Sequence, residues 1–447
     1  MSPARRAPKP REIPGLSRPR QPRLPSVAER LLPSGLRVVA VRRASVPLVQ
    51  VRMRIPTAVR REGDLARLLL LQRSMMLGTD ERSQGELAEA LQHIGGSLRF
   101  YADADGLAMA GDSLASELGQ LLGLAAEVLT SASYPRSAVE REAARFADGL
   151  RRALSQPGVL ADEAWRGRAF GAHPYGRDLP SPDDVLAVPA SSMRAAHRRR
   201  VGPAGATLVV VGDVRPARVL DQVERAWAGW TSGGAGSHVP PVHTLEPGPL
   251  LLVDRPGAVQ SNLRLGGPAP RRGEATYAAA EVANALFGGY FSSRLVTNIR
   301  EDKGYTYSPY SLINNAAAGS WVTVAADVAT EVTAPALLET SYELGRMASL
   351  PPGADEVAAT AQYLVGSIAL PTATQSGLAD TLLDLLTDGQ DVAWLREHPQ
   401  RLAAVTPEQV HEVSIPMLGP AGLVSAVVGD ADLVAGPLAA LGEVIRA

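Results

Sequence analysis

The chain has 447 residues, 45% of them hydrophobic and 20% charged, a composition typical of globular proteins. This length exceeds what one hydrophobic core supports, so two or more domains are expected. A net charge of −1 argues against nucleic acid or an anionic membrane as the main partner, and the lack of cysteine rules out disulfides and thiolate metal sites. No stretch approaches the roughly 18 apolar residues of a membrane span. We therefore expect a cytoplasmic protein.

The first predicted elements are a disordered arm, a β-hairpin and two helices, in that order. Residues 1–24 are rich in Pro and Arg and have no apolar core of a signal peptide, so we expect a disordered arm. Residues 30–55 alternate apolar and polar side chains, which predicts a β-hairpin. An apolar run at 65–77, closed by Gly78, and the amphipathic stretch 83–96 predict two helices.

The rest of the first half adds strands and longer helices. A strand pair is predicted around 98–111, and helical spacing of leucines predicts a long helix from about Ser113. Residues 137–170 are predicted to be helical with an interruption at Pro157, and 207–214 to form a buried strand. This half therefore mixes strands and helices along the chain.

A motif recurs near the end of each half of the sequence. Gly-Pro-Ala-Gly begins at Gly202 and again at Gly419, which lies 217 positions later (419 − 202 = 217). In both copies a Val-Gly-Asp places its Gly, Gly212 or Gly429, ten positions after the first Gly. Two chance copies at one spacing are improbable, so the sequence indicates an internal duplication.

These features predict an α+β protein of two homologous halves. Residues 232–248 are rich in Gly, Ser and Pro and are expected to be the linker. We expect an N-terminal domain at 25–231 and a C-terminal domain at 249–447, each an antiparallel sheet packed with helices.

Residues 286–310 form the most distinctive stretch of the chain. Gly288 and Gly289 precede a short amphipathic helix that contains Arg294 and Arg300. Gly304 is expected to end this helix, because glycine takes the left-handed conformation without steric cost. The alternating tyrosines that follow predict a strand with Tyr305 and Tyr307 on one face and Tyr310 on the other.

The motif FGG…SSRL…NIREDKGYTYS resembles the C-terminal signature of the insulinase/pitrilysin-type metallopeptidases. The resemblance implies that Arg300 and Tyr307 reach into the active site from the half that holds no zinc. It implies that Gly288 and Gly289 lie near the substrate, with a purely structural turn between two helices as the equally weighted alternative. We expect Tyr305, at a position where the family usually has an apolar residue, to contribute to the substrate-binding surface. Arg294 is a further candidate for that surface, with a surface ion pair as its favoured role.

The zinc motif of that family is missing from the first half. Its H-x-x-E-H helix aligns with residues 69–73, so that Leu69, Gln72 and Arg73 stand where the two histidines and the general base would be. At the third ligand's position stands Gly149. We therefore expect this chain to bind no metal, and we expect zinc on a partner subunit.

The resemblance implies a role within a larger enzyme. We expect a non-zinc-binding subunit of a heterodimeric zinc peptidase, whose partner carries H-x-x-E-H and which binds a peptide in a clam-shaped chamber. Arg300 and Tyr307 would bind that peptide and stabilise the oxyanion. The alternative is a catalytically inactive scaffold or a peptide-binding homodimer of the same fold.

Overall fold

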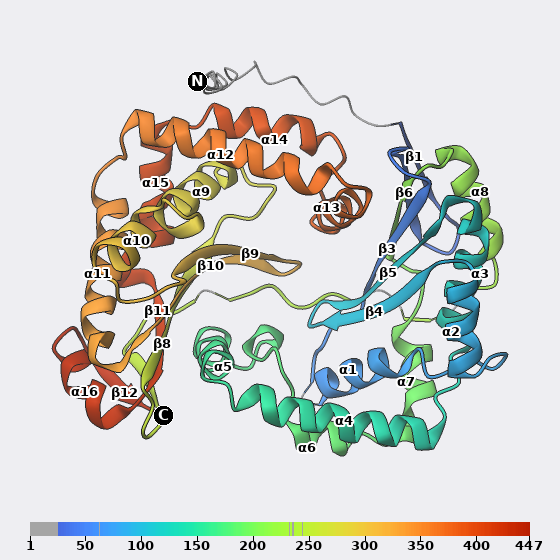
Figure 1. Cartoon of the computed structure of the whole chain (residues 1–447), viewed down its shortest axis with the longest axis horizontal. Coiled ribbons are helices and arrows are strands. Elements are labelled where there is room, and N and C mark those ends of the chain that lie inside the picture. The colour runs from blue at the N-terminus through green and yellow to red at the C-terminus, as the bar shows by residue number, and fades with distance from the viewer. Residues whose placement is uncertain (1–25, 62, 232, 235–236, 244) are drawn as a thin grey trace, which may run out of the picture.

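The computed structural model describes residues 26–61, 63–231, 233–234, 237–243 and 245–447. The expected arm at 1–24 and part of the expected linker lie outside these ranges. Figure 1 shows two groups of strands and helices side by side. Among the described residues, no helix is both long enough and apolar enough to cross a membrane.

The first group is built on a six-stranded sheet of order β1-β2-β6-β3-β5-β4. Its strands are β1 (Val27–Leu31), β2 (Arg37–Arg42), β3 (Leu48–Pro56), β4 (Ser97–Asp103), β5 (Gly106–Leu114) and β6 (Thr207–Gly212). Its helices are α1 (Asp64–Ser74), α2 (Gln84–His93), α3 (Leu118–Ser131), α4 (Arg136–Leu154), α5 (Pro157–Phe170), α6 (Pro182–Leu186), α7 (Met193–Arg200) and α8 (Pro216–Ala226).

The second group repeats this plan with the order β12-β7-β11-β8-β10-β9. Its strands are β7 (Leu250–Asp254), β8 (Gln260–Ala269), β9 (Tyr310–Ala316), β10 (Gly319–Ala329), β11 (Val424–Gly429) and β12 (Val444–Arg446). Its helices are α9 (Tyr277–Asn284), α10 (Arg294–Val296), α11 (Thr333–Ser349), α12 (Ala354–Thr372), α13 (Gln375–Thr387), α14 (Trp394–Ala403), α15 (Pro407–Leu418) and α16 (Ala431–Ala439).

The predicted α+β class with two similar halves is confirmed. Five strands of each sheet follow the same spatial order, and the repeated Val-Val-Gly forms the end of the equivalent strands β6 and β11. Each sheet is mostly antiparallel. Parallel pairing occurs where β6 joins β2 in the first sheet and where β7 joins both β11 and β12 in the second. The outermost strand differs, because the first sheet takes β1 from the start of the chain whereas the second takes β12 from its end.

Each sheet is covered on one face by a helix from the opposite half. In the first sheet, Val209 and Val211 pack against leucines of α13, including Leu382. In the second sheet, Val424 and Ala426 pack with Trp165 and other side chains of α5. One face of β6 therefore packs into the first core and the other packs against α13. This explains why every residue of the strand is buried.

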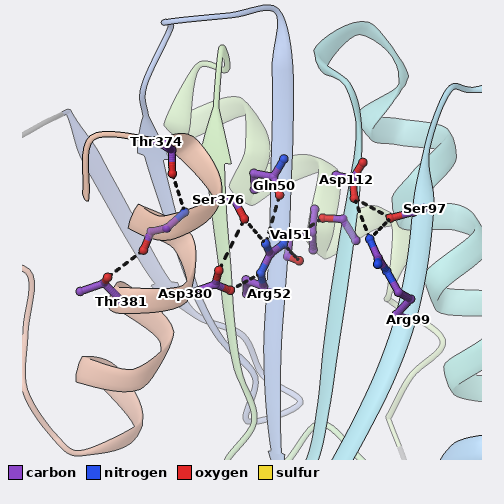
Figure 2. Close-up of polar contacts among 12 residues, drawn as sticks. Gln50, Val51, Arg52, Ser97, Arg99, Asp112, Thr374, Ser376, Asp380 and Thr381 are labelled. Carbon is purple, nitrogen blue, oxygen red and sulfur yellow. Dashed lines mark hydrogen bonds and ion pairs between the residues drawn. The ribbon is translucent and has the colours of Figure 1, made fainter. Parts of the chain in front are cut away.

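An ion pair closes each of these two helix–sheet contacts. Figure 2 shows Arg52 of β3 reaching Asp380 and Ser376 on α13, with 2.5 Å between Arg52 Nε and Asp380 Oδ1. In the other half, Nε of Arg264 on β8 lies 2.6 Å from Oδ1 of Asp162 on α5. The strands β3 and β8 hold equivalent places in the two sheets, so the contacts repeat the internal duplication.

One predicted boundary in the first half is wrong. The long helix expected from about Ser113 begins at Leu118, because β5 continues through Leu114 and pairs with Leu48 of β3. Cross-strand pairing here outweighs the helical spacing of the leucines. By contrast, Pro157 begins α5 at the first helical position, as its missing N–H allows.

Candidate functional site

The distinctive stretch 286–310 contains two π-helical segments, with a turn at 290–293 and the short α10 between them. Residues Ala285–Gly289 continue α9 as a π-helix, and Thr297–Asp302 continue α10 in the same way. Such wide turns occur often at functional sites. They hold the segment against β9, where Asn284 Nδ2 donates to the Ser311 carbonyl at 3.2 Å.

Gly288 is a packing residue in this arrangement. It is buried, and a Cβ placed there would lie 2.8 Å from the Cβ of Ser311. Only glycine therefore lets the π-helical turn approach β9 this closely. Gly289 is exposed at the end of the same turn and is accessible to a ligand.

The strand predicted for the tyrosines is only partly correct. Gly304 ends the helical segment with a φ of 65°, as expected, but the chain then forms a loop, and β9 begins only at Tyr310. The Tyr305 N–H donates back to the Ile299 carbonyl, and the Thr306 hydroxyl donates to the Asp327 carbonyl of β10. Pro309 lacks an N–H for a strand ladder. Tyr305 and Tyr307 therefore do not share a strand face.

The two tyrosines of this loop have different environments. Tyr305 is half-buried and packs against the core of the second half. Tyr307 is 89% exposed, so its phenol projects from the loop. The Tyr307 side chain is therefore the more exposed of the two.

Arg300 lies in the π-helical segment just before this loop. Its guanidinium carbon lies 4.4 Å from the centroid of the Phe291 ring, and its Nε lies 3.4 Å from Glu301 Oε1. The side chain is 31% exposed. Arg300 and Tyr307 make no hydrogen bond with each other, and each keeps donors that face solvent.

Arg294 is engaged within the protein. Its Nε and Nη2 donate to the two carboxylate oxygens of Glu356 at 2.8 and 2.6 Å. These hydrogen bonds hold the pKa of Glu356 below its ordinary value. The pair fastens α10 to α12, and only 14% of the Arg294 side chain is exposed.

Phe291, an aromatic residue that the sequence analysis did not single out, contacts Arg300. Phe291 is 63% exposed beneath the guanidinium, an unusual exposure for phenylalanine. Tyr290 stacks on Tyr363 of α12 with 4.8 Å between ring centroids. The signal that could have found Phe291 is its place two residues after Gly289, in a chain with only 4% aromatic residues.

The zinc-motif positions on α1 hold side chains with internal partners. Gln72 donates from Nε2 to the Phe100 carbonyl of β4 at 2.5 Å. Arg73 lies over the Phe146 ring of α4 at 4.1 Å and lies 3.4 Å from the buried carboxylate of Glu142. Burial is the main cause of a lowered pKa for Arg73. Leu69 is half-buried and packs against the first core.

These side chains do not suit a zinc ion. The leucine offers no donor atom, the amide binds zinc poorly, and the guanidinium repels a cation. In the part of the chain that the structure describes, no three His, Asp or Glu side chains cluster as metal ligands would.

The chain is similar to proteins named as zinc proteases. Residues 187–364 match the family described as "Peptidase M16 inactive domain". An uncharacterized zinc protease of Mycobacterium leprae is 26% identical over 293 residues, which are 64% of this chain and 66% of that protein, just under two thirds of its length. An uncharacterized zinc protease of Streptomyces coelicolor is 25% identical over 366 residues, 78% of this chain and 77% of that protein.

A more distant relative is named as a subunit of a larger enzyme. The probable mitochondrial-processing peptidase subunit beta of Arabidopsis thaliana is 23% identical over 197 residues, covering 43% of this chain and 37% of that protein.

Solved structures share the same fold. A peptidase M16 inactive domain from Pseudomonas fluorescens has a TM-score of 0.84 at 20% identity, covering 90% of this chain and 98% of that chain. A protease from Helicobacter pylori has a TM-score of 0.82 at 17% identity, covering 91% of this chain and 100% of that chain. Residues 187–364 therefore resemble the peptidase M16 inactive domain, and the chain as a whole shares its two-half fold with these solved structures.

Proposed function

We propose that this chain is the zinc-free subunit of a heterodimeric zinc peptidase. The observation that carries the proposal is the contrast between its two halves. Leu69, Gln72 and Arg73 occupy the zinc-motif positions, whereas Arg300 and Tyr307 keep donors open to solvent. The proposed partner is an H-x-x-E-H protein of the same family, and the proposed substrate is a peptide.

The chemistry of amide hydrolysis explains why two donors matter without a metal on this chain. A zinc ion held by the partner would supply the nucleophile for amide hydrolysis, a reaction that places negative charge on the carbonyl oxygen. The Arg300 guanidinium and the Tyr307 phenol would donate hydrogen bonds to that oxygen. Losing one such donor typically lowers the rate by roughly 10²- to 10³-fold.

The local structure prepares this pair. Phe291 supports the Arg300 guanidinium from below, and the loop that holds Tyr307 is fixed to β10 by the hydroxyl of Thr306. Gly304 separates the two donors with its left-handed turn. In the assembled complex, both donors would reach the same carbonyl oxygen of the bound peptide.

Substitutions in the assembled complex test this role. We expect Tyr307→Phe and Arg300→Ala each to lower kcat by about 10²-fold with the complex intact, because each removes one oxyanion donor. Peptide turnover and subunit ratio are measured together. Tyr342→Phe, which removes another exposed phenol on α11, serves as the control and is expected to stay within about twofold. Turnover within about twofold for both site variants would remove the assigned role.

The alternative function, a scaffold or a peptide-binding homodimer, has one structural feature in its favour. β9 and β4 are edge strands of their sheets, and an extended peptide can add to such an edge. A chain that forms a stable homodimer and binds peptides without any zinc-bearing partner would establish this alternative instead.

A further inference from the structure

A second, separate site lies at the start of α1. A hollow of about 400 Å³ opens where the loop after β3, the end of α7 and Ser237 meet. Five arginines and one carboxylate line it: Arg60, Arg61, Arg67, Arg199, Arg200 and Asp64. We call this hollow the arginine pocket. Neither Arg300 nor Tyr307 lines it.

Asp64 is fully engaged within the arginine pocket. Its Oδ1 lies 2.6 Å from Arg200 Nη2 and 3.5 Å from Arg67 Nη1. Its Oδ2 accepts from the backbone N–H groups of Arg61 and Arg60 at 3.1 and 3.3 Å. Two arginine side chains and two backbone N–H groups of this pocket therefore already hold one carboxylate.

Positive charge remains after this pairing. In the described part of the chain, no carboxylate lies within 4 Å of the guanidinium of Arg60, Arg61 or Arg199. Between residues 57 and 67 the sequence contains only one other acidic residue, Glu62, so arginines outnumber carboxylates even when it is counted. Burial is the main cause of a lowered pKa for Arg200, and the neighbouring Arg67 and Arg199 add to it.

Positive charge extends beyond the arginine pocket. Arg60 and Arg61 also border a neighbouring hollow of about 380 Å³, which Arg177 and one carboxylate, Asp184, also line. Arginines therefore outnumber carboxylates in both hollows. A planar guanidinium matches two oxygens of a phosphate at once.

We propose that the arginine pocket binds a small polyvalent oxyanion of the phosphate class. Arg60, Arg61 and Arg199 would bind the anion directly, and the Asp64–Arg200 pair would hold the wall in place. The pocket lies at one end of α1, and the zinc-motif positions begin five residues later, at Leu69 (69 − 64 = 5). The proposal does not depend on a peptidase partner.

Isothermal titration calorimetry of the chain with sodium tripolyphosphate tests the proposal, with sodium chloride used to keep the ionic strength constant. We expect saturable binding at a one-to-one ratio. Because hydrogen bonds to charged groups are strong, the variant Arg60→Gln/Arg61→Gln/Arg199→Gln should bind at least about tenfold more weakly. Arg198→Gln, which changes an exposed arginine of α7 outside the pocket, should bind like the wild type. Circular dichroism confirms that each variant is folded.

Three outcomes would overturn the proposal. The first is unchanged affinity in the triple variant. The second is an equal loss in Arg198→Gln, which would assign the binding to general surface charge. The third is equally tight binding of a glutamate peptide with the same net charge, which would assign the pocket to carboxylates. Because no peptide turnover is measured, failure here leaves the proposed peptidase role unaffected.

Discussion

His197 is a buried imidazole in the first core, 6% exposed. Its Nε2 lies 2.8 Å from the Leu129 carbonyl, which can only accept, so Nε2 carries the proton. Nδ1 therefore accepts from the Tyr134 hydroxyl at 2.7 Å. Both ring nitrogens are satisfied in the neutral form, and burial lowers the pKa of His197 below its ordinary 6.5.

The sign of the resulting pH dependence follows from linkage. A depressed folded-state pKa means that the unfolded chain binds the proton more readily. The contribution of His197 to the unfolding free energy is therefore fully present above about pH 6.5. It is lost as the pH falls toward and through the pKa of His197 in the folded state. We expect His197→Gln to lose less unfolding free energy between pH 7.5 and 5.5 than the wild type, as measured by urea denaturation. Equal losses in the two proteins would contradict this account.

At the residue scale, the sequence showed which chemical groups stand at the site positions, but not which side chains surround them in the fold. The absence of zinc ligands at Leu69, Gln72 and Arg73 was readable directly from the residue types. Their replacement contacts were not, because Arg73 meets Phe146 and Glu142 from a helix far along the chain. Arg294 was likewise recognisable as a charged residue, but only tertiary packing brings Glu356 to it.

At the scale of elements, the close contact between Gly288 and β9 controls the site. A methyl group at Gly288 would lie 2.8 Å from Ser311 Cβ, so the turn or the strand must shift. We expect Gly288→Ala to cost about 1–3 kcal/mol of unfolding free energy, as overpacking typically does. Urea denaturation measures the loss.

A matched glycine serves as the control for this substitution. Gly345 lies within α11 and has open space around a built Cβ. We expect Gly345→Ala to be neutral or stabilising, because alanine favours helix. If both substitutions changed stability equally, the contact between the π-helical turn and β9 would not be the cause.

The π-helical segments and the tyrosine loop were beyond sequence reasoning. Helical spacing and the stop at Gly304 predicted a helix. A π-helix differs from an α-helix only in that each N–H bonds to the carbonyl five residues back instead of four, and side-chain spacing does not reveal this difference. Alternating tyrosines favoured a strand, whereas Pro309 and the hydroxyl of Thr306 produced a loop. Such local competition is decided by tertiary partners that periodicity does not contain.

At the scale of the whole molecule, the two halves are joined by exchanged helices. The internal repeat predicted two similar sheets, but it did not indicate that α5 covers the second sheet and α13 the first. Both contacts bury apolar side chains. Each also includes an ion pair between an arginine of the sheet and a carboxylate of the covering helix, Arg52 with Asp380 and Arg264 with Asp162. Sequence periodicity identifies which face of a helix is apolar, but it leaves the covering partner undetermined.

The paired arginines provide a test of this arrangement. Arg52 and Arg264 are 9% and 5% exposed, so removing a carboxylate partner leaves a buried cation with fewer acceptors. We expect Asp380→Asn and Asp162→Asn each to cost about 1–2 kcal/mol of unfolding free energy. Asp148→Asn, which breaks an exposed pair with Arg151 on α4, should change it by less than about 0.5 kcal/mol. Similar losses in all three variants would show that the halves do not depend on these pairs.

The most direct test of the proposed function is purification of the tagged chain from its native cells. Co-purifying proteins are identified, and zinc is counted per complex. We predict an H-x-x-E-H protein at a one-to-one ratio and about one zinc ion per pair, because the zinc-motif positions of this chain lack ligands. A homo-oligomer without zinc would contradict the account and would make this chain a scaffold or a peptide binder.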